Sequence, residues 1–430
     1  MAVDERPGRR TRAARAVRAL SPRRPARRLL GYVLAERRTL RQGLGALLVG
    51  AAAAFVAGLT LGNITGTLQR LPGLFILIPA AAGMQNTVFG AVGARLGTST
   101  HIGIFEVTRR RSGVLYQNAF ASIVLTFFSS LYLAGLAKLS ALAFGLPSIS
   151  FLDFVTISVV GASLGAVVIL TVTVVVAIVS YRRGYDLDAV GTPLIIAAGD
   201  MTTIPALFLA TLLVHNPVVN AVIAGVAITV CAIAILRGIL TDLRLARRAM
   251  FEMLAVVLFT PLLDILAGTV IEARLAHFVA LPGLLIVIPP LISVAGDLGG
   301  ILSSRLSSKL HLGVISPRRL PEAPAILDAV LVVVSGVVVF TAIGTIGFGL
   351  SALLGKASPS LPIMLSSTVL AGFIASLFGL LIAYYIAVAT TRFGLNPDNH
   401  AIPIITSVMD LTGVVSFLVV LALLGVVTHG

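Results

Sequence analysis

The fold is decided by a stretch that reads Asn396-Pro397-Asp398-Asn399-His400-Ala401-Ile402-Pro403 and continues into the apolar segment from Ile404 to Val420. Asp410 lies near the middle of that segment. An ionised carboxylate at the centre of a bilayer costs about 2.5 kcal/mol or more relative to an apolar side chain, so an acid at this depth indicates a functional site. The pattern occurs once earlier: Arg182, Gly184, Asp188, Pro193, Asp200 and Thr202 recur 210 positions later as Arg392, Gly394, Asp398, Pro403, Asp410 and Thr412. The chain therefore contains an internal repeat.

The composition is that of an integral membrane protein. Of the 430 residues, 57% are hydrophobic and 11% are charged, and the mean hydropathy is +1.04, which leaves too little polar surface for a soluble protein of this length. Apolar runs reach the roughly 20 residues that span a hydrocarbon core as a helix, and they lack the period-two alternation of a transmembrane barrel. We therefore expect an all-α integral membrane protein. Its one cysteine, Cys231, excludes an intrachain disulfide.

The apolar runs predict eleven transmembrane helices. They cover residues 42–66, 72–95, 113–137, 151–181, 190–214, 217–236, 250–273, 282–305, 325–353, 362–391 and 400–427. The basic residues test this count, because cytoplasmic loops are enriched in Lys and Arg. With the N-terminus in the cytoplasm, 28 of the 32 Lys and Arg lie on the cytoplasmic side, and one missed helix would invert every later loop. The prediction is a protein of the cell membrane with a cytoplasmic N-terminus and an external C-terminus.

Residues 1–41 are predicted to form a basic cytoplasmic tail, with 13 Arg and three acids. The tail has no apolar core of the kind found in a signal peptide. Its arginines do not alternate with aromatic residues, so we interpret it as an orientation signal that contacts anionic lipid headgroups rather than as a nucleic-acid-binding arm. No nucleic-acid partner is expected despite the net charge of +15.

A second repeated block shows how far the duplication extends. Leu71-Pro72-Gly73-Leu74 reappears as Leu281-Pro282-Gly283-Leu284, and twelve of the 33 positions aligned from there are identical. Both blocks share the offset of 210 residues, so each half is one five-helix unit and the segment 217–236 is a linker helix. Five spans are an odd number, and the added helix gives the two units the same orientation. We therefore predict two parallel repeats related by a pseudo-twofold axis along the membrane normal, as in a fused homodimer.

This organisation divides the chain into four parts: the tail 1–41, a first five-helix repeat 42–214, the linker helix with its loop 215–249, and a second five-helix repeat 250–430. Because the duplication replaces a homodimer, a monomer is the expected oligomeric state.

Asp200 and Asp410 are the primary candidates for an ion site. Each lies about ten residues into its span, roughly 15 Å along the helix, which is near the bilayer midplane. The pseudo-twofold makes them equivalent, and two carboxylates facing one another across a dry interface repel. A divalent cation between them removes that penalty. The alternative interpretation is a pair of neutral or hydrogen-bonded structural acids.

The helices that follow Pro79 and Pro289 hold small and oxygen-bearing residues inside the membrane. Asn86 and Thr87 lie in one, and Asp297 lies in a glycine-rich segment of the other. We expect these helices to be broken or to allow close backbone approach, with oxygens available to an ion. The competing interpretation is small-residue helix packing without a ligand.

Further polar residues lie nearer the ends of the spans. Asn118 and Asp328 are equivalent in the repeat and are candidates for an ion entrance, although a solvated interfacial position fits equally well. Asp264 follows Pro261 but has Ala54 as its counterpart, which makes it a weaker candidate.

Charged residues in the loops are interpreted without a metal. Asp186, Asp188 and Asp398 precede the last span of each half and suit the N-terminus of a helix. His101 and His311 are interpreted as interfacial, and the spacing provides no His or Cys cluster suited to zinc.

Enzyme signatures are absent from the sequence. There is no Walker A pattern, no GxSxG and no HExxH, so the chain is predicted not to be an enzyme and not to hydrolyse a nucleotide.

At these motifs the sequence resembles the MgtE family of divalent cation transporters, and in its duplicated form the solute carrier 41 branch. The first family signature is matched in part by Pro79, Gly83, Arg95 and Leu96, and by Pro289, Gly296, Asp297, Ser304, Arg305 and Leu306. The second is similar to Asn396-Pro397-Asp398-Asn399 with Pro403 and Asp410, and more loosely to Asp186-Leu187-Asp188 with Pro193 and Asp200.

The resemblance implies a Mg²⁺ pathway on the twofold axis in which Asp200 and Asp410 hold a hydrated ion, with Mn²⁺ or other divalent metals as further substrates. It implies no prosthetic group. Thr87 and Asp297 stand where the family has Asn, and the N-terminal helical and CBS domains of bacterial members have no room in the tail, so gating by them is not expected. The competing predictions are a Na⁺- or H⁺-coupled transporter of another solute and a membrane scaffold without transport.

Overall fold

The computed structural model describes residues 37–108, 110–183, 191–393 and 397–426. The chain divides into two compact units, Met1–Gly45 and Ala46–Gly430, and the helix contacts and the site belong to the second. Most of the predicted tail, together with Asp186 and Asp188, lies outside the described residues. The side chains of His311 and Asp398 are likewise not described.

The structure confirms the eleven predicted helices. Among the described residues, eleven helices are long and apolar enough to cross a membrane. They are α3 (Arg37–Asn63), α5 (Leu74–His101), α6 (Val114–Ala143), α7 (Phe151–Arg183), α8 (Thr192–Thr211), α9 (Pro217–Ile239), α10 (Arg244–Glu272), α12 (Pro282–His311), α13 (Ala323–Leu353), α14 (Leu361–Phe393) and α15 (Pro397–Leu423). Shorter elements are α4 (Thr65–Arg70), η2 (Leu212–His215) and α11 (Leu275–Ala280). Except at its ends, a helix satisfies its backbone polar groups internally, which is what an apolar solvent demands.

The order of elements repeats with the sequence. Helices α3 to α8 correspond to α10 to α15, and α9 has no counterpart. Turn residues repeat as well: Gly145 after α6 and Gly355 after α13 have φ of 65° and 61°, the left-handed conformation that glycine adopts without strain at a helix end. The repeat therefore extends to how individual helices end.

Each repeat places its first helix against the other repeat. Gly268 of α10 lies so close to α5 that a β-carbon there would be 2.5 Å from the carbonyl oxygen of Ile76. The equivalent Gly58 of α3 makes the equivalent close approach to the carbonyl oxygen of Ile286 on α12. Helix α10 also packs against α6 and α15, so it contacts both repeats. This exchange brings residues of α10, Asp264 among them, to the boundary between the repeats.

A buried carboxylate fixes the far end of α10. Glu272 is 9% exposed, and its Oε1 and Oε2 accept hydrogen bonds from the backbone N–H groups of Gly73 (2.7 Å) and Phe75 (3.1 Å). These donors begin α5, where backbone N–H groups have no partner inside the helix and the helix dipole favours a negative charge. The bond joins the second repeat to the first.

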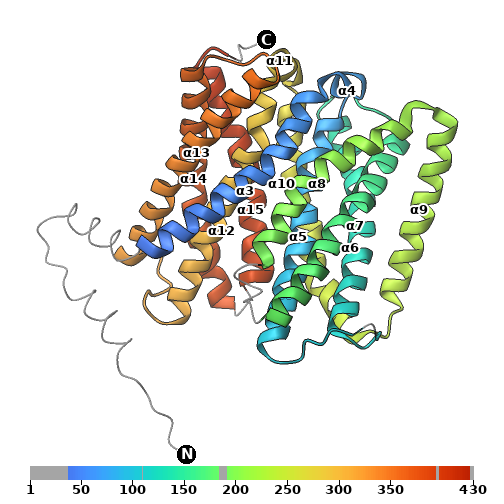
Figure 1. The fold of residues 1–430 in the computed structure, drawn as a ribbon, viewed down its shortest axis with the longest axis vertical. Helices are drawn as coiled ribbons and strands as arrows, with labels where there is room; N and C mark the ends of the chain where they lie inside the picture. The colour runs from blue at the N-terminus through green and yellow to red at the C-terminus, as the bar shows by residue number, and fades with distance from the viewer. Residues whose placement is uncertain (1–36, 109, 184–190, 394–396, 427–430) are drawn as a thin grey trace, which may run out of the picture. The chain divides into compact units, whose positions relative to one another are not determined.

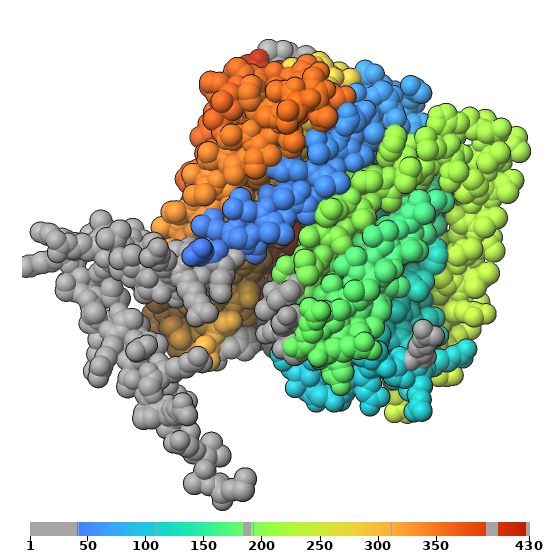
Figure 2. All heavy atoms as spheres, viewed as in Figure 1, coloured from blue at the N-terminus to red at the C-terminus, as the bar shows by residue number. Residues whose placement is uncertain are grey.

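Helix α9 lies at one side of the compact unit Ala46–Gly430, packed against α6 and α7 and on the side opposite α13 and α14 (Figure 1). Its contact with α7 is polar: the Asn220 amide donates to Asp153 Oδ1 (2.6 Å), and Thr156 donates to Asn220 Oδ1 (2.5 Å). On the face shown in Figure 2, residues 46–63 of α3 (blue) lie between the orange spheres of the second repeat and the green spheres of the first. The peripheral position of α9 suits a linker helix that only carries the chain back across the membrane between the two repeats.

The expectation of broken helices after Pro79 and Pro289 was wrong. Both α5 and α12 are continuous, with these prolines inside them. A proline removes one backbone hydrogen bond, and neighbouring helices hold the rest of the helix in place. The alternative, close approach, is what the glycines provide: a β-carbon at Gly299 would be 2.6 Å from Ile405 and 3.1 Å from Met409 of α15.

Candidate functional site

Asp200 lies on α8 where the two repeats meet. It is 8% exposed, and both of its oxygens accept hydrogen bonds. The Asn86 amide of α5 donates to Oδ1 (2.7 Å), and the Ser293 hydroxyl of α12 donates to Oδ2 (3.0 Å). Asn86 belongs to the same repeat as Asp200, whereas Ser293 belongs to the other. The predicted position of this acid at the repeat interface is thus supported by a direct bond between repeats, and Ser293 is a site residue that the sequence analysis missed.

Asp410 lies at the equivalent place on α15 but has different neighbours. A β-carbon at Gly83 of α5 would be 3.8 Å from Asp410 Oδ2, and one at Gly296 of α12 would be 3.7 Å from Oδ1. The repeat offset makes Gly83 the counterpart of Ser293 and Gly296 the counterpart of Asn86. The contact with the opposite repeat is therefore retained, while both hydrogen-bond donors are replaced by glycine.

Asp264 of α10 is the third acid of this region. It is 1% exposed, and neither of its carboxylate oxygens has a hydrogen-bond partner, although Ser407 of α15 lies close by. A β-carbon at Gly83 would be 2.7 Å from Asp264 Oδ2. Asp264 and Asp410 thus approach the same glycine. The sequence ranked Asp264 low because its counterpart is Ala54, and the signal that could have raised its rank is its own charge inside an apolar span.

Asp297 of α12 is the fourth acid. It is partly buried, and its Oδ2 lies against α3, 3.2 Å from where a β-carbon of Gly50 would be. It interacts electrostatically with Asp200, and Asp410 interacts with Asp264, Asp200 and Asp297. None of the four acids forms a salt bridge with a described basic side chain.

The neutral candidates on α5 differ in their surroundings. Asn86 donates its amide to Asp200, and its own Oδ1 is buried against Gly199 without a donor. Thr87 is partly buried at the position equivalent to Asp297. Thr87 forms no hydrogen bond with the acids in the part of the chain that the structure describes. Asn86 is thus part of the cluster, whereas the role of Thr87 stays a prediction.

Asp328 and Asn118 lie elsewhere, near the starts of α13 and α6. Asp328 is fully buried, and its Oδ1 accepts from Arg305 Nη2 at 2.9 Å and Nε at 3.1 Å, while its Oδ2 pairs with Lys309. The Asn118 amide donates to the Val114 carbonyl (2.9 Å). The proposed ion-entrance role of this pair stays a prediction, and the cations around Asp328 favour a structural role. His101, the last residue of α5, is exposed, as an interfacial position requires.

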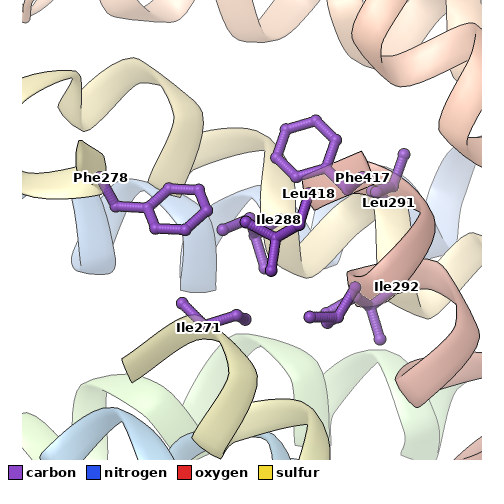
Figure 3. Close-up of a pocket in the computed structure, with 8 residues that line it drawn as sticks. Ile271, Phe278, Ile288, Leu291, Ile292, Phe417 and Leu418 are labelled. Atoms are coloured by element: carbon purple, nitrogen blue, oxygen red, sulfur yellow. The ribbon is translucent and has the colours of Figure 1, made fainter. Parts of the chain in front are cut away.

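Apolar side chains alone line a pocket between α10, α11, α12 and α15. Figure 3 shows Phe278, Ile288 and Phe417 with their hydrocarbon neighbours around it. A cation cannot exchange its hydration shell for such a lining, because none of these groups offers an oxygen. This pocket is therefore not a suitable place for an ion.

The acid cluster, formed by Asp200, Asp264, Asp297 and Asp410, attracts cations. Buried carboxylates without cationic partners are unfavourable both because they lose hydration and because they repel one another, and a bound cation relieves both costs. Among the described residues, no three His, Cys, Asp or Glu side chains gather as a ready-made metal centre. Such a sparse arrangement suits an ion that keeps part of its water shell.

Comparisons with known proteins agree with this chemistry. The family model of MgtE, described as a divalent cation transporter, matches residues 78–210 and again 288–420. Solute carrier family 41 member 3 of Rattus norvegicus is 34% identical over 134 residues, 30% of this chain and 28% of that protein. The protein of the same name from Mus musculus is 33% identical over 134 residues, 30% of this chain and 27% of its own length. The match thus spans less than a third of the curated relatives.

One solved structure covers nearly the whole chain with a weak likeness. It is the eukaryotic MATE transporter AtDTX14, which covers 92% of this chain and 96% of its own with a TM-score of 0.36 and 14% identity. At that TM-score the likeness supports no argument about fold or function.

Proposed function

Because the chain belongs to the MgtE family of divalent cation transporters, we propose that it conducts Mg²⁺ across the membrane between its two repeats, with Asp200 and Asp410 as the central ion site. Mg²⁺ is the substrate, and Mn²⁺ and related divalent ions are secondary substrates. Eleven candidate membrane-spanning helices among the described residues and two matches to the family model support such a pathway.

The observation that supports the proposal best is the reciprocal contact between repeats. Asp200 of the first repeat accepts a hydrogen bond from Ser293 of the second, and Asp410 of the second approaches Gly83 of the first. Each mid-helix acid therefore faces the other repeat at equivalent positions. An ion between them meets negative charge from both sides.

The choice of Mg²⁺ rests on the number of ligands. Mg²⁺ binds through one or two carboxylates and keeps several waters, whereas Ca²⁺ takes about six to eight oxygen ligands. The cluster offers few carboxylates at any one point and no ready-made cage among the described residues. Such a site is compatible with an ion that keeps several of its waters.

The test is Mg²⁺ uptake in cells that lack their own magnesium transport. Asp200→Asn and Asp410→Asn keep the side-chain shape and remove the charge, and each is expected to reduce uptake to background while the protein still reaches the membrane. Asp153→Asn is the matched control, because Asp153 is an acid at the start of α7, outside the cluster, whose partners are Ser150 and Asn220. Full uptake in both cluster variants would overturn the proposal.

A further inference from the structure

We infer that the cation rests to one side of the pseudo-twofold axis, between Asp264 and Asp410 beside Gly83, in a half-site that only the second repeat's acids form. The inference builds on the proposed function and adds a resting position and a ligand, Asp264. It follows from how differently the two repeats surround their equivalent aspartates.

The half around Asp200 is already satisfied. Asn86 occupies one oxygen and Ser293 the other, both at ordinary hydrogen-bond distances of 2.7 and 3.0 Å. A carboxylate that accepts such bonds is stabilised as an anion without a metal. This half therefore has less to gain from a bound cation.

The half around Asp410 lacks those donors. The positions of Ser293 and Asn86 are taken by Gly83 and Gly296, which have no side chain to donate. In place of the missing hydroxyl stands a second carboxylate, Asp264, whose Oδ2 is on the side of Gly83 that Asp410 also approaches. Asp200 therefore has a hydroxyl donor, Ser293, from the other repeat, whereas Asp410 has a carboxylate acceptor, Asp264, beside it.

The only donor near Asp264 among the described residues is the Ser407 hydroxyl, and a cation between Asp264 and Asp410 would offset the repulsion of the two acids. Asp264 is 1% exposed and both of its oxygens lack a hydrogen-bond partner. No described lysine, arginine or histidine forms a salt bridge with it. Leaving a buried charge unpaired is strongly unfavourable, and a divalent cation that takes one ligand from Asp264 and one from Asp410 compensates both charges.

Gly83 supplies the space for that ion. A β-carbon at this position would be 2.7 Å from Asp264 Oδ2 and 3.8 Å from Asp410 Oδ2, so it would fill space that both acids border. On the same helix, a β-carbon at Gly90 would be 3.9 Å from its nearest neighbour, Ile196. Gly83→Ala and Gly90→Ala are thus a matched pair, in which only the first obstructs the half-site and neither removes a charge.

The test is equilibrium binding of Mn²⁺ to the purified full-length chain in lipid nanodiscs, followed by electron paramagnetic resonance with Mg²⁺ as competitor. Replacing residues that merely orient a metal ligand weakens affinity by about 10- to 100-fold. We expect Asp264→Asn, which removes a ligand, and Gly83→Ala, which fills space beside that ligand, each to weaken Mn²⁺ binding by at least about tenfold. Gly90→Ala should bind as the wild type, and Ser293→Ala should have a smaller effect than Asp264→Asn.

Thermal unfolding with and without Mg²⁺ separates a ligand from a structural residue. Asp264→Asn is expected to unfold without metal at or above the wild-type temperature, because it removes a buried unpaired charge, and to lose the stabilisation that Mg²⁺ gives the wild type. A structural acid, or a pair that shares a proton, would instead lower the unfolding temperature equally with and without Mg²⁺, and this would overturn the inference.

The outcomes also separate this inference from the proposed function. Suppose that Asp410→Asn loses Mn²⁺ binding while Asp264→Asn and Gly83→Ala bind Mn²⁺ as the wild type does. This result would agree with the central site and would reject the off-axis half-site. Wild-type binding and uptake in the Asp200→Asn and Asp410→Asn variants would reject the proposed function itself.

Discussion

Asp200 and Asp410 occupy the same place in two copies of one sequence pattern, and their different neighbours show what a duplicated chain can do that a homodimer cannot. Around Asp200 the partners are an amide and a hydroxyl, whereas around Asp410 they are two glycines and a third acid. A homodimer would present identical surroundings on both sides of its axis. In this chain the two sides are free to specialise.

The sequence assigns these acids a depth in the membrane, which stays a prediction, and it does not identify their partners. Depth follows from counting residues along an apolar helix, and this count alone puts Asp200 and Asp410 near the midplane. The partners Ser293 and Asp264 come from helices distant in sequence, and no periodicity encodes which face of α10 or α12 turns toward α8 or α15. Asp264 was ranked low only because the repeat lacks it.

Asp328 provides a test at the residue level. Its two oxygens pair with Arg305 and Lys309 in a fully buried position. Breaking such a group by removing one partner costs about 3 to 5 kcal/mol, so Asp328→Asn should lower the thermal unfolding temperature of the purified protein markedly. Uptake per folded molecule should remain.

The result that would contradict this structural role is a variant of unchanged thermal stability without uptake. Such a result would return Asp328 to the group of ion ligands. Asp153→Asn serves again as the control, because its acid is only partly buried at the start of α7.

At the level of helices, the eleven candidate membrane-spanning helices could be predicted from the sequence. The packing of α3 and α10 against the opposite repeat could not. Long apolar runs are helical because lipid offers no partner for backbone N–H and C=O groups. That rule says nothing about which helix packs on which. The swap of α3 and α10 between repeats depends on Gly58 and Gly268, which as sequence signals are indistinguishable from the chain's other glycines. Pro79 and Pro289 led to a wrong prediction of broken helices, because α5 and α12 remain continuous through them.

Gly268 tests the exchange of helices. Gly268→Ala would place a β-carbon 2.5 Å from the carbonyl oxygen of Ile76, and overpacking of this kind costs about 1 to 3 kcal/mol. Thermal unfolding in detergent should show a clear loss of stability. Gly225→Ala on α9 is the control: nothing lies within 4 Å of its β-carbon position, and alanine favours a helix by about 1 kcal/mol relative to glycine. Equal stability of the two variants would show that α10 does not pack closely on α5.

For the whole molecule, the duplication could be predicted because two repeated sequence blocks share the offset of 210 residues. Helix α9 could be predicted as the helix that belongs to neither repeat. Its peripheral position beside α6 and α7 agrees with a role in chain direction rather than in the site (Figure 1). The orientation of the chain in the membrane stays a prediction, based on the distribution of basic residues.

Cysteine labelling tests that orientation in a Cys231→Ala background. Parallel repeats predict that Arg111→Cys and Arg319→Cys react with a membrane-impermeant maleimide only from the cytoplasm. Phe144→Cys and Leu354→Cys, in the turns after α6 and α13, should react only from outside. All four positions are exposed. Reaction of Phe144→Cys and Leu354→Cys from opposite sides would show that the repeats are antiparallel.

The central claim is that a divalent cation binds among buried carboxylates where the two repeats meet. Its most direct test is the anomalous diffraction of Mn²⁺ in crystals of the full chain. The account predicts a peak where the repeats meet, within coordination distance of Asp410, and the further inference places that peak on the side of Asp264 and Gly83. A peak confined to other parts of the molecule, or bound Mn²⁺ with no peak between the repeats, would contradict it.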